Sequence, residues 1–113
     1  DVYAESFREC TNLESIRAKT ITIVTDAFLG CTNLTTLPVI ANNTLYANSF
    51  KDCTSLQEVI LNANVSTIDS TAFSGSAVQT IYVNGNSSCT TAQTLQALNP
   101  SQYNNANIVY TEN

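Results

Sequence analysis

The sequence predicts an α/β solenoid of about four coils with short parallel strands, followed by a C-terminal cap. Similar segments recur at steps of 21, 22 and 23 residues, marked by Phe7, Phe28, Phe50 and Phe73. Apolar or small residues keep their distances from each phenylalanine, while the positions between them are mostly polar. The pattern stops after Val83, where turn and helix signals replace it.

The repeated segment is clearest in three copies that begin at Ser6, Ala27 and Ser49, and a fourth copy from Ala72 is one residue shorter. Counting from each phenylalanine gives five further columns, which are Val2/Ile23/Leu45/Ile68, Cys10/Cys31/Cys53/Ser76, Leu13/Leu34/Leu56/Val78, Ile16/Leu37/Val59/Ile81 and Ala18/Val39/Leu61/Val83. A single coil cannot bury its apolar face, so we expect coils to stack with phenylalanine against phenylalanine.

Each coil is expected to contain three elements. Leu-Gln-Glu-Val-Ile-Leu, which ends at Leu61, fits a Leu-x-x-Leu-x-Leu strand, and stacked strands of this kind form a parallel sheet. The column of Ile23, Leu45 and Ile68 predicts a second short strand on the opposite wall. The segment Ala/Ser-Phe-x-x-Cys has the spacing of one helical turn.

The C-terminal part differs from the repeats. Residues 84–88 read as a turn, and residues 90–98 as a helix capped by Thr90 or Thr91 and ended by Asn99-Pro100. A last strand is expected over residues 108–110. We therefore divide the chain into repeats, residues 1–83, and a capping segment, residues 84–113. The N-terminus shows no comparable cap, so we expect a fragment of a larger protein with further repeats upstream.

The pattern Ala-Phe-x-x-Cys-x-x-Leu-x-x-Ile, with an aliphatic residue five positions before the phenylalanine, resembles the BspA-like leucine-rich repeat over residues 1–83. Two departures are Ser76 in the cysteine column and the lack of proline after most strands. The resemblance implies a leucine-rich-repeat solenoid. Because family members are mostly secreted or surface-attached, it also implies an extracellular or cell-surface location.

The function that this resemblance implies is adhesion-type binding of a protein partner, such as host extracellular matrix or another cell surface. The alternative is a structural spacer or stalk without a ligand of its own. Fold resemblance alone does not decide between these two roles.

Composition excludes other partners. The net charge is −5, from four basic and nine acidic residues, which opposes binding to nucleic acid or anionic lipid. No apolar run approaches the ~20 residues that span a bilayer, so we expect no membrane insertion in this segment.

The sequence gives little support for a catalytic site or a metal site. Without histidine, neither a Ser-His-Asp nor a Cys-His constellation is available. A carboxylate pair drawn from Glu14, Glu58 and Asp69 is the remaining option, and solvated surface acids are the simpler interpretation. Cys10, Cys31 and Cys53, at 21- and 22-residue spacing, suit buried packing better than metal binding. We therefore expect no enzyme, no cofactor and no metal site.

Two kinds of modification stay open. Cys89 lies outside the cysteine column and is expected to be a free thiol, although pairing with Cys53 or with another chain is possible in principle. Four Asn-x-Ser/Thr sequons are either glycan acceptors or incidental to an Asn- and Thr-rich composition, and we favour the second interpretation. They begin at Asn33, Asn42, Asn64 and Asn86.

A binding face is expected where strand residues between the buried columns point outward. The predicted outward columns are Ser15/Thr36/Glu58/Thr80, Arg17/Pro38/Ile60/Tyr82 and Lys19/Ile40/Asn62/Asn84. Apolar residues grouped beside an arginine are typical of interface hot spots, whereas single exposed apolar residues are ordinary. The predicted binding residues are Arg17, Pro38, Ile40, Glu58, Ile60, Thr80 and Tyr82.

Overall fold

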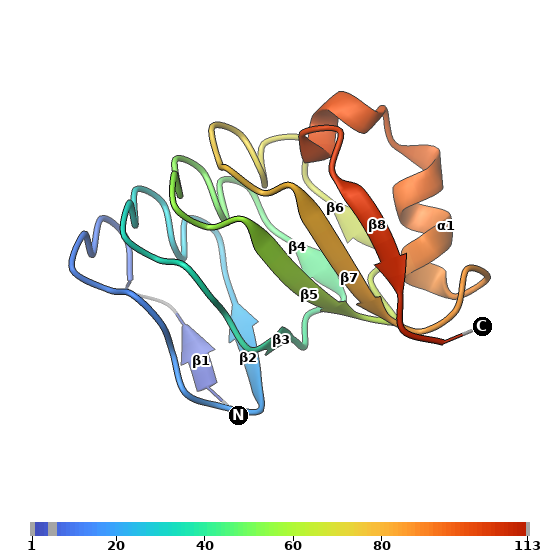
Figure 1. Cartoon of the computed structure of the whole chain (residues 1–113), viewed down its shortest axis with the longest axis horizontal. Coiled ribbons are helices and arrows are strands. Elements are labelled where there is room, and N and C mark those ends of the chain that lie inside the picture. Colours follow the sequence, from blue (N-terminus) through green and yellow to red (C-terminus); the bar gives the residue numbers. More distant parts are fainter. Residues whose placement is uncertain (1, 5–6, 113) are drawn as a thin grey trace.

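The computed structural model describes residues 2–4 and 7–112, and successive turns of the chain lie side by side along its length (Figure 1). One sheet has the order β1-β2-β3-β5-β7-β8, and every pairing in it is parallel. Its strands are Val2–Ala4 (β1), Thr20–Ile23 (β2), Val39–Ile40 (β3), Glu58–Asn62 (β5), Thr80–Asn84 (β7) and Asn107–Tyr110 (β8). These parallel strands and few helices agree with the predicted α/β class.

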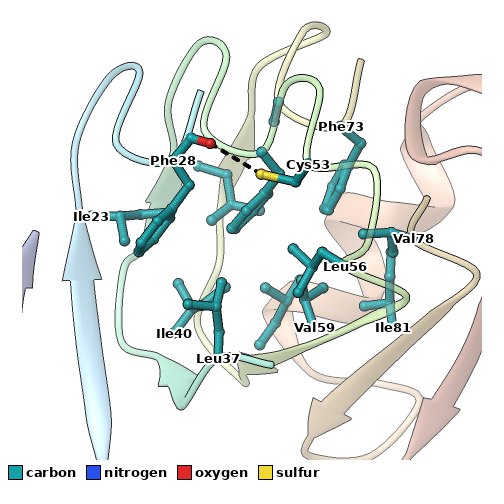
Figure 2. Close-up of a cluster of buried hydrophobic side chains, with 14 of the residues drawn as sticks. Ile23, Phe28, Leu37, Ile40, Cys53, Leu56, Val59, Phe73, Val78 and Ile81 are labelled. Carbon is teal, nitrogen blue, oxygen red and sulfur yellow. Dashed lines mark hydrogen bonds between the residues drawn. The ribbon is translucent and has the colours of Figure 1, made fainter. Parts of the chain in front are cut away.

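The four phenylalanines form a continuous stack, as predicted. Ring centroids are 5.6, 6.4 and 5.4 Å apart along the series, with interplanar angles of 10°, 6° and 23°. Phe28, Phe50 and Phe73 are fully buried, while Phe7 is half-buried. Figure 2 shows Phe28 and Phe73 of this stack above the Leu56, Val59, Val78 and Ile81 side chains, and the stack and the aliphatic columns form one core.

A reverse turn follows each phenylalanine, in place of the helical turn that the spacing predicted. The residue two positions after each phenylalanine has positive φ: Glu9 57°, Gly30 75°, Asp52 60° and Gly75 71°. The N–H three positions after the phenylalanine donates to its carbonyl at 3.0 to 3.1 Å. Positive φ at the third residue of a four-residue turn is incompatible with a right-handed helix, so the prediction of a helical turn is wrong.

The strand register also differs from the predicted columns. Ile21 pairs with Ile40, Ile40 with Leu61, and Leu61 with Val83. The sequence had placed Ala18 and Val39 in the first two of these positions, and that alignment is wrong. Ile21 and Ile40 are fully buried, which is the behaviour expected of core positions.

Unequal segment lengths explain the shift. The separation from each phenylalanine to its core strand residue (Phe7 to Ile21, and so on) falls through 14, 12, 11 and 10 residues. The separation from that strand residue to the next phenylalanine rises through 7, 10 and 12 residues. The two changes nearly cancel, so an almost constant phenylalanine spacing conceals them.

The opposite wall is a two-stranded parallel sheet of Thr44–Leu45 (β4) and Thr67–Ile68 (β6). The predicted pairing of Leu45 with Ile68 is confirmed. Ile23 instead lies in β2 of the larger sheet, because its coil has the shortest return segment. Ser6, the predicted start of the first copy, and the side chain of Val2 lie outside the described residues.

Asparagine side chains complete backbone hydrogen bonding where the return segments lengthen. Asn42, only 7% exposed, accepts from the Ile23 N–H at 2.8 Å and donates to the Ile23 carbonyl at 2.6 Å. Asn62 Nδ2 donates to the carbonyls of Ile40 and Asn42, at 2.9 and 2.7 Å. Buried backbone groups left unpaired would cost free energy, so these amides replace missing strand partners.

The C-terminal elements follow the prediction, with one correction. Helix α1 is Thr90–Ala97, a 3-10 helix is Pro100–Tyr103, and β8 contains the expected last strand. The helix cap is Cys89, whose Sγ accepts from the Ala92 N–H at 3.4 Å, so the prediction of a threonine cap is wrong. Thr91 is buried, and its Oγ1 donates to the Asn62 carbonyl at 2.5 Å. That residues 84–113 act as a cap stays a prediction.

Candidate interaction face

The outward face of the larger sheet has a row of apolar side chains across it. Side chains alternate along a strand, so Val59 and Leu61 of β5 are buried and Ile60 between them is partly exposed. Ile60 pairs with Tyr82, and Tyr82 with Val109. The Ile40–Leu61 pairing sets Val39 beside Ile60. We call Val39, Ile60, Tyr82 and Val109 the central row.

Polar residues flank the central row on both sides. Glu58, Thr80 and Asn107 are in register two residues before it. Asn62 and Asn84 pair with each other on the opposite side of the row, two residues after Ile60 and Tyr82. The Asn62 side-chain amide already donates to two neighbouring carbonyls. The face is therefore an apolar strip between polar edges. Within the strip, Val109 is the most exposed residue, at 42%.

The structure brings four of the seven predicted binding residues together. Glu58, Thr80, Ile60 and Tyr82 share the outward face of β5 and β7. Arg17 is exposed, but it precedes β2 and does not join this row. The residue of β2 that pairs with Val39 is Thr20.

The predicted outward orientation is wrong for two of the seven residues, because Ile40 is fully buried and Pro38 is also buried. The two core residues Leu37 and Ile40 lie three positions apart, whereas Val59 and Leu61 lie two apart. The additional residue turns Val39 outward instead of Pro38 or Ile40. Val39 and Val109 are outward-facing residues that the sequence analysis missed. The three-residue spacing of Leu37 and Ile40 could have indicated Val39, and alternation in the last strand could have indicated Val109.

A polar hollow lies at the start of β5. It has a volume of about 390 Å³ and is lined by Thr35, Ser55, Gln57 and Glu58. Because Glu58 also belongs to the polar edge of the face, the hollow adjoins that edge. A larger hollow of about 450 Å³ lies away from this face, between β6 and α1, where Ile68 and Leu98 are among its lining residues.

The cysteine column is a packing feature. The Cys31 thiol donates to the Phe7 carbonyl at 2.8 Å, and the Cys53 thiol donates to the Phe28 carbonyl at 3.0 Å (Figure 2). Both residues are fully buried, as expected. Burial raises the pKa of Cys53 to about 12 and also raises the pKa of Cys31. These thiols are therefore neutral and inert at physiological pH.

Asp69 and the cysteines are the other side chains that the sequence offered for catalysis or metal binding. Asp69 Oδ1 accepts from the N–H and the hydroxyl of Thr71, at 2.9 and 2.6 Å, and these bonds lower the pKa of Asp69. In the part of the chain that the structure describes, no three Cys, Asp or Glu side chains are grouped so as to hold a metal ion, and the four cysteines form no disulfide. No helix in residues 2–4 and 7–112 is long and apolar enough to cross a bilayer.

The four sequons differ in accessibility. Asn33 and Asn64 are exposed and Asn86 is partly exposed. Asn42 is buried, and both polar atoms of its side chain are bonded to Ile23. The folded chain therefore does not offer Asn42 as an acceptor.

Comparison with known proteins identifies the family. Residues 1–106 match the BspA type leucine rich repeat region, with six copies. The match therefore covers more copies, and more of the chain, than the four predicted repeats. No curated protein and no solved structure matches the chain. Repeats of this type are common in surface proteins, where they are protein-interaction modules and are generally non-enzymatic. Since the match covers most of the sequence, this chain belongs to the BspA-type leucine-rich repeat family.

Proposed function

We propose that this chain is a solenoid of about four repeats that binds a protein partner outside the cell, in an adhesion-type role, through the outward face of its larger sheet. The family supports protein interaction in general. The partner class we propose is an exposed segment of extracellular matrix or of another cell surface.

The central row is the observation that favours this role most. Val39, Ile60, Tyr82 and Val109 lie in register on four adjacent strands, β3, β5, β7 and β8. Three strand spacings make the row ~14 Å long. A contiguous apolar strip with an aromatic residue and polar edges has the anatomy of a protein interface, with an apolar centre and a polar rim.

The test measures binding of the chain to a panel of immobilised extracellular matrix proteins by surface plasmon resonance. Ile60→Ser and Tyr82→Ser should each weaken binding about tenfold or more, because hot-spot side chains dominate interface energy. Tyr46→Ser is the control, since Tyr46 is an exposed tyrosine that follows β4 on the opposite wall.

Thermal unfolding of the three variants should stay close to that of the unchanged chain, since none of the side chains is fully buried. If a matrix protein binds and both face variants bind it as well as Tyr46→Ser does, the outward face is not the binding surface. If no panel member binds, a spacer role gains support over adhesion.

A further inference from the structure

We propose that Glu58 and Tyr82 form a subsite for an arginine side chain of the partner, within an extended peptide segment that lies on the central row. This inference rests on the proposed function, because it assigns one partner side chain to the face described above. It goes further in specifying a guanidinium group and the two residues that recognise it.

The carboxylate of Glu58 is available for a cation. Glu58 is exposed and lines the polar hollow, and its carboxylate makes no hydrogen bond or ion pair with any other residue that the structure describes. The hollow is lined by no basic residue. The ion pair observed among the described residues, between Arg8 and Asp26 at 3.8 Å, involves neither Glu58 nor its neighbours. The negative charge of Glu58 is thus uncompensated.

The register places an aromatic ring diagonally across from this carboxylate. Glu58 pairs with Thr80 and Ile60 pairs with Tyr82, so Glu58 and Tyr82 are diagonal neighbours on β5 and β7. Strand geometry gives about 8 Å between their Cα atoms. A guanidinium between them can lie flat on the ring and direct N–H groups to the carboxylate, an arrangement that suits arginine better than lysine.

Water would take the N–H groups of the guanidinium that Glu58 does not. A guanidinium has five N–H donors, of which a carboxylate takes two in the bidentate arrangement. The hollow is lined by Thr35, Ser55 and Gln57 beside Glu58, and by neither Ile60 nor Tyr82, so it extends toward the coil of β3 rather than toward β7. Its volume of about 390 Å³ leaves room for water beside the carboxylate. The neighbouring Ile60 and Val109 would pack against apolar side chains beside the arginine.

The overall charge favours the same partner. The chain has a net charge of −5, so its field attracts a basic segment and repels an acidic one. An arginine flanked by β-branched residues in an extended peptide is therefore the partner chemistry that complements both the charge and the apolar row.

The experiment is a ¹⁵N–¹H NMR titration of the full chain with the acetylated, amidated hexapeptide Val-Thr-Arg-Val-Thr-Val. A second peptide replaces arginine with citrulline, which has nearly the same shape but no charge. We expect amide shifts at Glu58, Ile60 and Tyr82, with the citrulline peptide binding about three- to tenfold more weakly. Glu58→Gln should weaken binding of the arginine peptide to the same extent and leave the affinity for the citrulline peptide unchanged. Glu14→Gln, an exposed carboxylate outside the hollow, is the matched control and should have no effect.

Tyr82 is tested by two substitutions. Tyr82→Phe keeps the ring and should retain the preference for arginine over citrulline, while Tyr82→Leu should reduce it about two- to fivefold. Equal affinities for the two peptides, or an unchanged affinity in Glu58→Gln, would overturn the inference. If the citrulline peptide still shifts amides of the central row, the proposed binding face stands without its arginine subsite. If neither peptide nor any matrix protein binds, both proposals fail.

Discussion

Asp52 and Gly75 occupy the same left-handed position in adjacent coils, with φ of 60° and 71°, and they are in close contact. A Cβ added to Gly75 would clash with Asp52 Oδ1. The backbone joins them as well, since the Asp52 N–H donates to the carbonyl of Ser74 at 3.0 Å. At Gly75 the turn thus constrains conformation, and an added side chain requires the Asp52 carboxylate to move.

Replacing Gly75 with alanine should lower the free energy of unfolding by about 2–3 kcal/mol. Left-handed backbone accounts for about 1–2 kcal/mol of this, and the contact with Asp52 for the remainder. Urea denaturation measures the loss. In an Asp52→Gly background the same substitution should cost only about 1–2 kcal/mol, because the contacting carboxylate is absent. An equal cost in both backgrounds would show that Asp52 simply rotates away.

Truncating the middle of the aromatic stack should be severe. Phe50 is fully buried between Phe28 and Phe73, at 6.4 and 5.4 Å. Phe50→Ala should therefore cost about 3–5 kcal/mol, through lost apolar burial and the cavity left behind. Phe7→Ala, at the half-buried end of the series, should cost distinctly less and serves as the comparison in chemical denaturation. A stable Phe50→Ala variant would contradict the observed packing.

The register of β3 has a direct test. Ile40→Ser should destabilise the chain by about 2–5 kcal/mol, because a fully buried aliphatic side chain is replaced by a polar one. Val39→Ser, one residue earlier and partly exposed on the outward face, should change stability by no more than about 1 kcal/mol. The two thermal unfolding curves distinguish the observed register from the one that the sequence columns predicted. If Val39→Ser were the more damaging variant, the predicted columns would be correct after all.

Cys53 should make stability depend on pH in the alkaline range. Its pKa is raised from 9.0 to about 12 in the folded chain, because burial disfavours the thiolate. The contribution is fully present below pH 9.0 and is lost as pH rises toward about 12, since the unfolded chain releases its proton first. The slope from this one group is at most about 1.4 kcal/mol per pH unit.

The measurement compares urea denaturation of the unchanged chain with Cys53→Ala at about pH 8 and about pH 10. Tyrosine titration is common to both proteins, so the difference in slope isolates the thiol. A steeper fall in the unchanged chain is expected. Parallel behaviour of the two proteins would mean that Cys53 is accessible to solvent in the native state.

Much of the fold follows from local sequence. The phenylalanine stack, the Leu45–Ile68 pairing and the helix near Thr90–Ala97 were all predictable, because each rests on apolar periodicity or on short-range signals. The reverse turn after each phenylalanine was missed, although Gly30 and Gly75 were visible hints of positive φ. The Cys89 cap was missed because cysteine is not among the residues usually preferred there.

The candidate face was only half predictable. Glu58, Ile60, Thr80 and Tyr82 were found because β5 and β7 follow the ideal alternation without insertion. Val39 was missed and Ile40 misplaced, because the chain between Leu37 and Ile40 contains one residue more than its counterpart in β5.

By itself, then, the sequence determined the repeat, its aromatic column and the outward residues of two strands. The physical reason is that apolar spacing within one coil encodes which side chains must be buried. Only the tertiary structure decided which residues of neighbouring coils lie side by side. That choice is made by hydrogen bonding between strands, as in the pairing of Ile40 with Leu61, and unequal segments on either side of each strand conceal it from any alignment anchored on the phenylalanines.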